Sequence, residues 1–278
     1  DVYKRQNAYW SSTPLAQSNR EIGQEVWAIE FGTGRDGPVF VEAGGVAVRC
    51  VRNSNGPSTL PDTGQTMCYD SVGNVVDCAI ETGLCPGLAL PVESGCRNDP
   101  DRFVDNQDGT VTDTCTGRMW QQESNISFEW CVALDYANSL NFGGHSDWRM
   151  PNIRELYSIV DYSRLKFTDP VFSVLPNAYW SSTHTFAGPS VAWAISFATG
   201  TIGPIDVSLG SGVFVRAVRN ISTLPDTGQN LCYDSDEFGT IVDCFDPTTC
   251  PGQDGFHDTG CPNDDDRFVD NLDGTVTD

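Results

Sequence analysis

The pattern of apolar and polar residues between positions 101 and 220 predicts strands, then two helices, then strands again. Near its start, apolar residues flank the turn residues 106–109, which is typical of a β-hairpin, and a strand with Met119 and Trp120 follows. Near its end, the segments YWSST, VAWAISF and GVFVRAVRN show the alternation expected of strands. Strands and helices separated along the chain in this way indicate an α+β domain.

Both predicted helices have a start signal and an apolar stripe. Ser127 is the expected N-cap of the first helix, and the glycine pair at 143–144 is expected to end it. The second helix lies within 147–163 and starts with Asn152 and Glu155 at the spacing of a capping box. The residues expected to face the core are Trp130, Leu134 and Ala137 in the first helix and Ile153, Leu156, Ile159 and Val160 in the second.

The later strands have a predicted inward face. In VAWAISF these inward residues are Val191, Trp193, Ile195 and Phe197. In the closing strand we expect Val213, Val215 and Ala217 to point inward and Arg216 to point outward. Trp180 and Trp193 could stack on sugar rings, but indoles on alternating strands more often belong to the core.

Several segments of the chain occur twice. NAYWSST starts at 7 and 177, STLPDTGQ at 58 and 222, and DRFVDN at 101 and 266, so the spacing is 164–170 residues, the size of a domain with its linker. We therefore expect a piece of a tandem array. Its parts are the C-terminal part of a first domain (1–53), a cysteine-rich acidic linker (54–100), a complete domain (101–220), a second such linker (221–265) and the start of a third domain (266–278).

The net charge of −22 is concentrated in the two linkers. Linker 54–100 has six acidic residues and one arginine, and linker 221–265 has ten acidic residues and no lysine or arginine, which gives −5 and −10. So acidic a chain repels nucleic acid and anionic lipid. No apolar run approaches the length that spans a bilayer. We expect neither a nucleic-acid partner nor membrane insertion of this segment.

Eleven cysteines against three histidines, without a CxxC pair, indicate disulfides rather than zinc. Disulfides in turn indicate an extracellular or cell-surface location. Because the linkers have few apolar residues, we expect disulfides to hold them as stapled spacers. The expected pairs are Cys68–Cys78 and Cys232–Cys244 across short hairpins, Cys85–Cys96 and Cys250–Cys261 beside them, and Cys115–Cys131 in the complete domain. Cys50 is expected to be unpaired, because its partner would lie upstream of residue 7.

Four ordered segments, RFVDNQDGTVTDTCTGRMW, GGHSDWRMPNIRELYSIVDYS, NAYWSST and VRAVRN, resemble the Lcl C-terminal domain family, named for a domain of a bacterial collagen-like adhesin. The resemblance implies a C-type-lectin-like fold in which the first and last strands pair and tandem domains hang on their linkers like beads. It also implies secreted or surface proteins, and kinship with formylglycine-generating enzymes. The calcium-dependent sugar motifs of true C-type lectins are absent from the chain.

No catalytic residue is expected, because the three histidines are not repeated and no complete nucleophile–base pair is visible. No cofactor is expected, with calcium as the one possibility. The acidic residues of the hairpin at 105–113 lack the EF-hand spacing and suit a turn better, so the weak calcium candidates are Asp264, Asp265 and Asp266. Candidate ligand residues lie in the loops that differ between the copies: His184, Thr185, Phe186, Asp206 and Ser208.

We therefore expect a non-catalytic repeat module of a large extracellular bacterial surface protein, acting as an adhesin stalk or a filament subunit. Its partners would be other copies of itself or neighbouring repeats. One alternative is a receptor domain that binds a ligand or glycan through its variable loops. Another is a relative of formylglycine-generating enzymes, although no complete cysteine-pair site of that kind is visible.

Overall fold

The computed structural model describes most of the complete domain and parts of the segments on either side. The described residues are 8–14, 25–30, 35–40, 68–69 and 75–76, then 101–219 except 125, 163, 165, 176, 186–189 and 210–211, then 227, 229, 231–233, 240–244, 252–257, 269–271 and 276–277.

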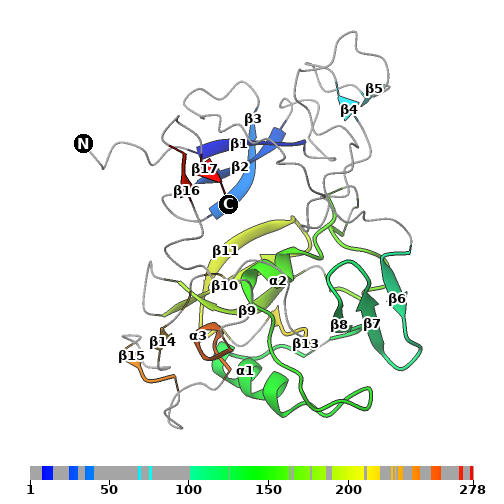
Figure 1. Ribbon diagram of the computed structural model, residues 1–278, viewed down its shortest axis with the longest axis vertical. Helices are drawn as coiled ribbons and strands as arrows, with labels where there is room; N and C mark the ends of the chain where they lie inside the picture. Colours follow the sequence, from blue (N-terminus) through cyan, green and yellow to red (C-terminus); the bar gives the residue numbers. More distant parts are fainter. Residues whose placement is uncertain are drawn as a thin grey trace.

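Strands dominate the described elements (Figure 1), and in chain order two helices separate the earlier strands of the complete domain from the later ones. The complete domain contains β6 (Phe103–Asp105), β7 (Thr110–Asp113), β8 (Arg118–Gln121), α1 (Trp130–Ser139), α2 (Ile153–Tyr157), β9 (Ala178–His184), β10 (Val191–Ser196), β11 (Thr201–Asp206), β12 (Val213–Phe214) and β13 (Val218–Arg219). Elsewhere lie β1 (Ala8–Pro14), β2 (Glu25–Glu30), β3 (Arg35–Phe40), β4 (Cys68–Tyr69), β5 (Val75–Val76), β14 (Cys232–Tyr233), β15 (Ile241–Val242), α3 (Asp254–His257), β16 (Val269–Asp270) and β17 (Val276–Thr277). The predicted α+β class is confirmed.

Two four-stranded sheets form the complete domain, with the strand orders β11-β10-β9-β12 and β13-β8-β7-β6. The expectation that the first and last strands pair is wrong here. The strand β13 pairs with β8, and β6 lies at the opposite edge of the same sheet. The reason is that β6, β7 and β8 form a meander, which leaves the free edge of β8 for the returning chain.

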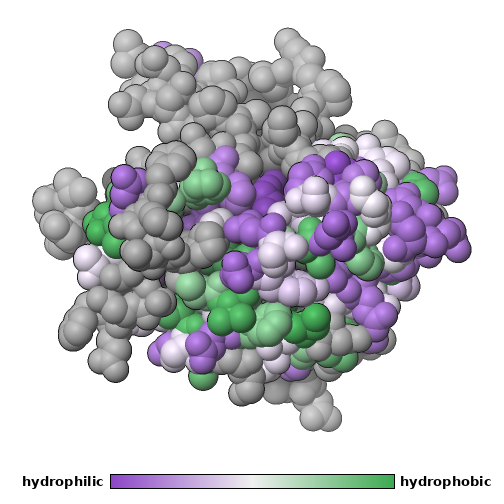
Figure 2. All heavy atoms as spheres, turned by 90° about the horizontal axis from the view of Figure 1, so that it is seen from below, coloured by the Kyte–Doolittle hydropathy of each residue, from purple (hydrophilic) through white to green (hydrophobic). Residues whose placement is uncertain are grey.

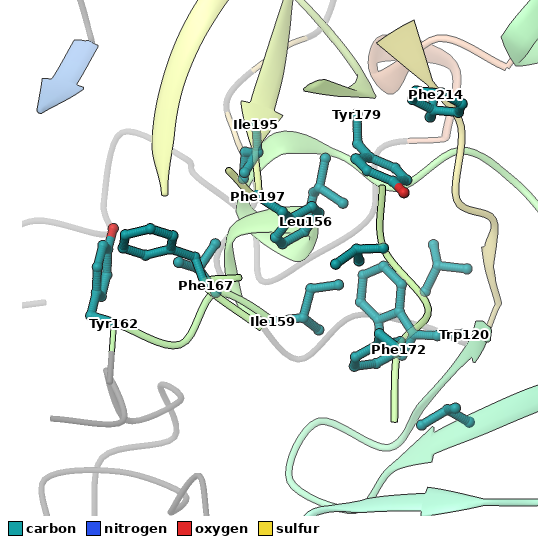
Figure 3. Packing of buried hydrophobic residues seen from close by; sticks show 14 residues of the cluster. Trp120, Leu156, Ile159, Tyr162, Phe167, Phe172, Tyr179, Ile195, Phe197 and Phe214 are labelled. Atoms are coloured by element: carbon teal, nitrogen blue, oxygen red, sulfur yellow. The ribbon is translucent and has the colours of Figure 1, made fainter. Parts of the chain in front are cut away.

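The β9–β10 part of the first sheet is buried on both faces, because successive side chains of a strand point to opposite sides. On one side, Tyr179 and Ile195 pack with Leu156 of α2 and with Trp120 of β8 (Figure 3). On the other side, Trp180 packs with residues of α1. The two hydrophobic clusters of the domain therefore share this sheet, and the core assignment of Trp180 is confirmed.

Burial on both faces also explains an error in the predicted inward face of β10. Val191 and Trp193 are only half-buried, whereas Ala192 and Ala194 are buried in the cluster beneath α1. The prediction holds in the second half of the segment, where Ile195 and Phe197 are buried.

The helix α1 begins later than predicted. Its N-cap is Glu129, without a side-chain capping bond, and Ser127 instead forms a β-bridge with Phe214. The helix ends at Leu140, before the glycine pair at 143–144, whose φ angles of 59° and 77° belong to the following turn. The predicted stripe is confirmed, since the buried residues are Trp130, Ala133, Leu134 and Ala137.

The helix α2 starts as predicted and ends early. Asn152 and Glu155 form the capping box, with Glu155 N–H donating to Asn152 Oδ1 at 2.8 Å. The helix stops at Ser158, whose hydroxyl donates to the Glu155 carbonyl at 2.6 Å and closes the last turn. Ile159 and Val160 are buried as predicted, but from the turn after the helix.

The prediction that Arg216 points outward is wrong. Its side chain is completely buried, and its guanidinium donates to the carbonyls of Gln121, Gln122 and Ser173. Between β12 and β13 the chain is not a regular strand, so the alternation that placed Val215 and Ala217 inward does not turn Arg216 outward.

The repeated strand pairs that the structure describes in both copies share the same pairing. In β1–β2, Ala8 lies opposite Glu30 and Trp10 opposite Ala28; in β9–β10, Ala178 lies opposite Ser196 and Trp180 opposite Ala194. Both pairs have an irregularity just after the tryptophan. The linker hairpins β4–β5 and β14–β15 also share one register, as do β6–β7 and β16–β17.

Candidate functional site

The segment DWRMPNIREL, which carries part of the family resemblance, holds a buried ion-pair network. Arg149 Nη1 and Nη2 each donate to one carboxylate oxygen of Glu155 at 2.7 Å, and Arg118 Nε lies 3.2 Å from Glu155 Oε1. Burial alone would raise the pKa of Glu155, but the charges of Arg149 and Arg118 hold this pKa below its usual range. Each of these buried charges therefore has an oppositely charged partner inside the domain.

The segment after the complete domain packs against it, beside α1 and β9 (Figure 1). The ring of Tyr233 in β14 stacks on His184 at the end of β9, with centroids 4.0 Å apart and planes 18° apart. His184 also contacts Trp130 of α1 in an edge-to-face arrangement, with ring centroids 5.7 Å apart. Pairs of this kind contribute about 0.5–1.5 kcal/mol beyond the burial of area. His184 is thus a bridge between the domain and its linker.

Asp254 of α3 lies at the buried centre of this contact, with 1% of its surface exposed. Its Oδ2 accepts hydrogen bonds from Thr183 Oγ1 at 2.7 Å and from Thr227 Oγ1 at 2.6 Å. Thr183 Oγ1 also accepts the N–H of Ile153 at 3.0 Å, so one hydroxyl connects the carboxylate to α2. Burial opposes the charge of Arg149, yet nearby carboxylates, Asp254 among them, raise the pKa of this arginine. The linker carboxylate thus adds to the buried network of the domain.

Gly252 and Gln253 allow the linker to pack closely against α1 and β14. Gly252 has φ +80°, and a Cβ there would lie 1.9 Å from Nδ2 of Asn138 in α1. The buried side chain of Gln253 accepts the N–H of Tyr233 at 2.9 Å and donates to the carbonyl of Tyr233 at 2.6 Å. It therefore supplies the hydrogen bonds that a neighbouring strand would supply.

Disulfides are not all that holds this part of the linker, because it also packs against the domain. Cys232, Tyr233, Gln253 and Asp254 are all buried. A segment with few apolar residues can still pack on a domain when its buried polar groups find partners. Those partners come here from Thr183, Thr227 and the backbone of Tyr233.

A signal for this contact is present in the sequence. In the aligned copies, Asp254 corresponds to Ala89 and His184 corresponds to Pro14. A polar residue in the second linker and a polar residue in the second domain are therefore replaced together by apolar ones in the first copy. Comparing the copies for paired changes, rather than for differences in loops alone, could have found the contact.

The candidate ligand residues fall into two groups. His184 and Thr185 are buried, the first under Tyr233, so they are not an exposed loop surface. Asp206 and Ser208 are exposed, and Asp206 Oδ1 accepts hydrogen bonds from Ser208 N at 2.9 Å and from its Oγ at 2.7 Å. Phe186 lies outside the described residues.

The acidic residues of the β6–β7 hairpin are engaged in the turn. Asp105 Oδ1 accepts the N–H of Gln107 at 2.8 Å, and Asp108 Oδ1 accepts the N–H of Thr110 at 2.9 Å. Asp113 forms a buried ion pair with Arg102, with Nη2 and Oδ2 2.8 Å apart. In the described ranges, no group of three or more metal-ligating side chains is present. Asp264, Asp265 and Asp266 lie outside these ranges.

The disulfide Cys232–Cys244 is present as predicted and closes the β14–β15 hairpin, with its Cα atoms 5.1 Å apart. Cys115 and Cys131 are both disulfide-bonded, and their pairing with each other stays a prediction. The other cysteines predicted to be paired lie outside the part of the chain whose side chains the structure describes: Cys68, Cys78, Cys85, Cys96, Cys250 and Cys261. Cys50, which is predicted to be unpaired, also lies outside it.

Replacing Cys232 and Cys244 together by serine is expected to loosen the linker and leave the domain folded. The chain-entropy estimate for a loop of this size is about 3 kcal/mol, and the sulfurs are 12 residues apart in sequence. Limited proteolysis with mass mapping should show faster cleavage near residues 231–257 and an unchanged domain fragment. Equal cleavage rates in both proteins would contradict a stabilising role for this disulfide.

Comparison with family models matches residues 109–219 to the Lcl C-terminal domain. No curated protein matches the chain. Among the described residues, no helix has both the length and the apolar character needed to cross a membrane.

Proposed function

We propose that this chain, whose residues 109–219 match the Lcl C-terminal domain family, is a non-catalytic repeat module of a large extracellular bacterial surface protein, serving as an adhesin stalk or a filament subunit. The observation that carries the proposal is the docked linker. A linker fixed to the domain before it, through His184, Tyr233 and Asp254, turns domain and linker into one stiff unit. Stiff units in series are what a stalk or filament needs.

The repetition of segments and of strand registers supports a tandem array. Units that contain the same strand pairing, as in β1–β2 and β9–β10, would present equivalent surfaces at regular intervals along the chain. We include the C-type-lectin-like fold of residues 101–220 in the proposal. Its support is the family match.

The surroundings of two histidines support a non-catalytic role. His184 is held between aromatic rings. Burial, followed by the positive charge of Arg149, lowers the pKa of His257 to about 4, so this imidazole is neutral at physiological pH. The extracellular location is supported by the disulfide Cys232–Cys244, because such bonds persist in oxidising surroundings.

A second candidate function is ligand or glycan binding next to Asp206 and Ser208. The carbonyl of Val207 accepts the N–H of Trp130 at 3.0 Å, so this loop adjoins the start of α1. Leu209 and Val132, near this junction, are 50% and 48% exposed. Figure 2 shows apolar side chains gathered among polar ones on one side of the domain. Apolar surface beside exposed polar groups is a feature of recognition sites.

Negative-stain imaging of the intact parent protein tests the proposal. We expect a fibre with one uniform domain spacing and little variation in the angle between successive domains. Flexible particles in which the angle between successive domains varies widely would contradict the proposal. A glycan array probed with this chain tests the second function. Saturable binding that is lost on replacing Asp206 by alanine would favour a receptor domain. Absence of binding would favour the stalk or filament over a glycan receptor.

A further inference from the structure

The strand β3 of the first, partial domain lies against β11 of the complete domain (Figure 1). Both are edge strands, since their sheets have the orders β1-β2-β3 and β11-β10-β9-β12. An edge strand has backbone N–H and C=O groups without a neighbouring strand and is therefore a ready site for association. Here the two edges face each other.

Asp36 of β3 makes the polar contacts between them. Its Oδ1 accepts the N–H of Ile202 in β11 at 2.8 Å, and its Oδ2 accepts the hydroxyl of Tyr157 at 3.1 Å. The Tyr157 hydroxyl is also hydrogen-bonded to that of Tyr162. One carboxylate thus caps a backbone donor on the edge of β11 and joins a pair of tyrosines at the end of α2.

The two residues in contact occupy the same place in their repeats. The segments TGRDGP and TGTIGP start at 33 and 199, so Asp36 and Ile202 are equivalent positions. Contact between equivalent positions is what a local two-fold relation between two units produces. The residues nevertheless differ, and only the aspartate can accept the N–H of the other strand. Two units that both have isoleucine here would leave this donor uncapped.

We propose that the β11 edge, with Tyr157 and Tyr162, is a docking site for the Asp36-bearing edge strand of the neighbouring repeat. The partner is thus the preceding repeat of the same chain, and Asp36 selects it. This inference rests on the proposed function, because it takes the partial domain to be a repeat of the array. It adds that successive repeats touch side by side as well as through their linkers.

Hydrogen exchange of the Ile202 amide in the full chain measures the contact directly. In the protein with Asp36→Leu, which cannot accept the hydrogen bond, we expect this amide to exchange at least tenfold faster. In Asp36→Asn, whose Oδ1 can still accept it, the rate should stay near that of the unsubstituted protein. The matched control is Asp105→Asn, an exposed aspartate of β6, which should change nothing at Ile202.

A third variant reaches the contact from the other side. Tyr157→Phe removes the hydroxyl that donates to Asp36 and leaves the first domain untouched, so Ile202 should exchange severalfold faster even if Asp36→Leu impairs folding of β1–β3. Equal exchange at Ile202 in the unsubstituted, Asp36→Leu and Tyr157→Phe proteins would overturn the docking site. Protection that falls on dilution would also overturn it, because a second chain would then supply the strand.

The contact should strengthen in mild acid. Burial raises the pKa of Asp36 from 3.8 to about 6, although the hydrogen bond from Ile202 acts against this. The groups that face the Asp36 carboxylate are the N–H of Ile202 in β11 and Ile29, which lies opposite Asp36 in β2. Tyr157 at the end of α2 and Tyr162 after it also lie close, and their own pKa values are raised.

A group with a raised pKa stabilises the contact at low pH and loses that effect as the pH rises through the raised value. The protection factor of Ile202, corrected for intrinsic exchange, should therefore increase about tenfold from pH 7 to pH 5. It should stay constant in Asp36→Asn, and a flat profile in the unsubstituted protein would count against the buried carboxylate. Failure of these tests would not contradict the proposed stalk of stiff domain–linker units, because imaging of the parent protein tests that proposal separately.

Discussion

Replacing Glu155 by alanine is expected to lower the free energy of unfolding of the complete domain by about 3–5 kcal/mol, the usual cost of breaking a buried ion pair from one side. The reason is that Arg149 and Arg118 would keep buried guanidinium groups without their shared carboxylate. Urea unfolding followed by tryptophan fluorescence measures the change. Glu155→Gln keeps the shape of the side chain and removes its charge, so it serves where the alanine variant does not fold.

The exposed ion pair between Arg219 and Asp147 provides the control. Asp147 has 59% of its side chain exposed, so Asp147→Ala should cost less than about 1 kcal/mol. A similar small loss in Glu155→Ala would contradict the role given to the buried network. The network also predicts an acid limit. Because the pKa of Glu155 is held below its ordinary value of 4.5, its stabilising effect is present above that value and is lost as the pH falls further.

Replacing Asp254 by alanine is expected to release the linker from the domain without unfolding the domain. The variant loses two hydrogen bonds to a buried carboxylate, those from Thr183 and Thr227. Hydrogen bonds to charged groups contribute roughly 1.5–3 kcal/mol each and do not add fully, so we expect a loss of about 3 kcal/mol. The amide of Tyr233, which donates to Gln253, should then exchange about 100-fold faster.

Asp243→Ala is the matched control, because Asp243 is exposed and lies on the same hairpin. It should leave the exchange of Tyr233 unchanged. The amide of Ile195, in the core of the domain, should not respond to either substitution. Exchange at Tyr233 that is equally fast in the unsubstituted protein and in Asp254→Ala would show that the linker is not docked in solution.

Local signals in the sequence were sufficient for the elements whose cause is local. The turn at 106–109 and the capping box of Asn152 and Glu155 depend on residues within a few positions of one another, and both are present. The stripe of α1 follows from its own periodicity. The start of the same helix was misplaced, because Ser127 is drawn into a bridge with Phe214, a residue remote in sequence.

The features that the sequence did not reveal depend on such remote partners. Arg216 is buried because carbonyls of Gln121, Gln122 and Ser173, which belong to two other segments, converge on it. In the candidate site, His184 looked like a loop residue because Tyr233 follows it only much later in the chain. Composition indicated a linker held by disulfides, but it could not show which of its polar groups would find hydrogen-bonding partners inside the domain.

The docking of α3 also limits how far the chain from Val269 onward, which we propose begins a third repeat, can move away from the domain. If the linker were not docked, the 49 residues between Arg219 and Val269 could extend about 170 Å. With α3 docked, only residues 258–268 separate His257 from Val269. These eleven residues reach at most about 40 Å. The shorter tether keeps the next repeat within a smaller volume and so raises its effective concentration at its neighbour. Weak contacts between repeats, too weak to hold separate molecules together, can then persist along the chain.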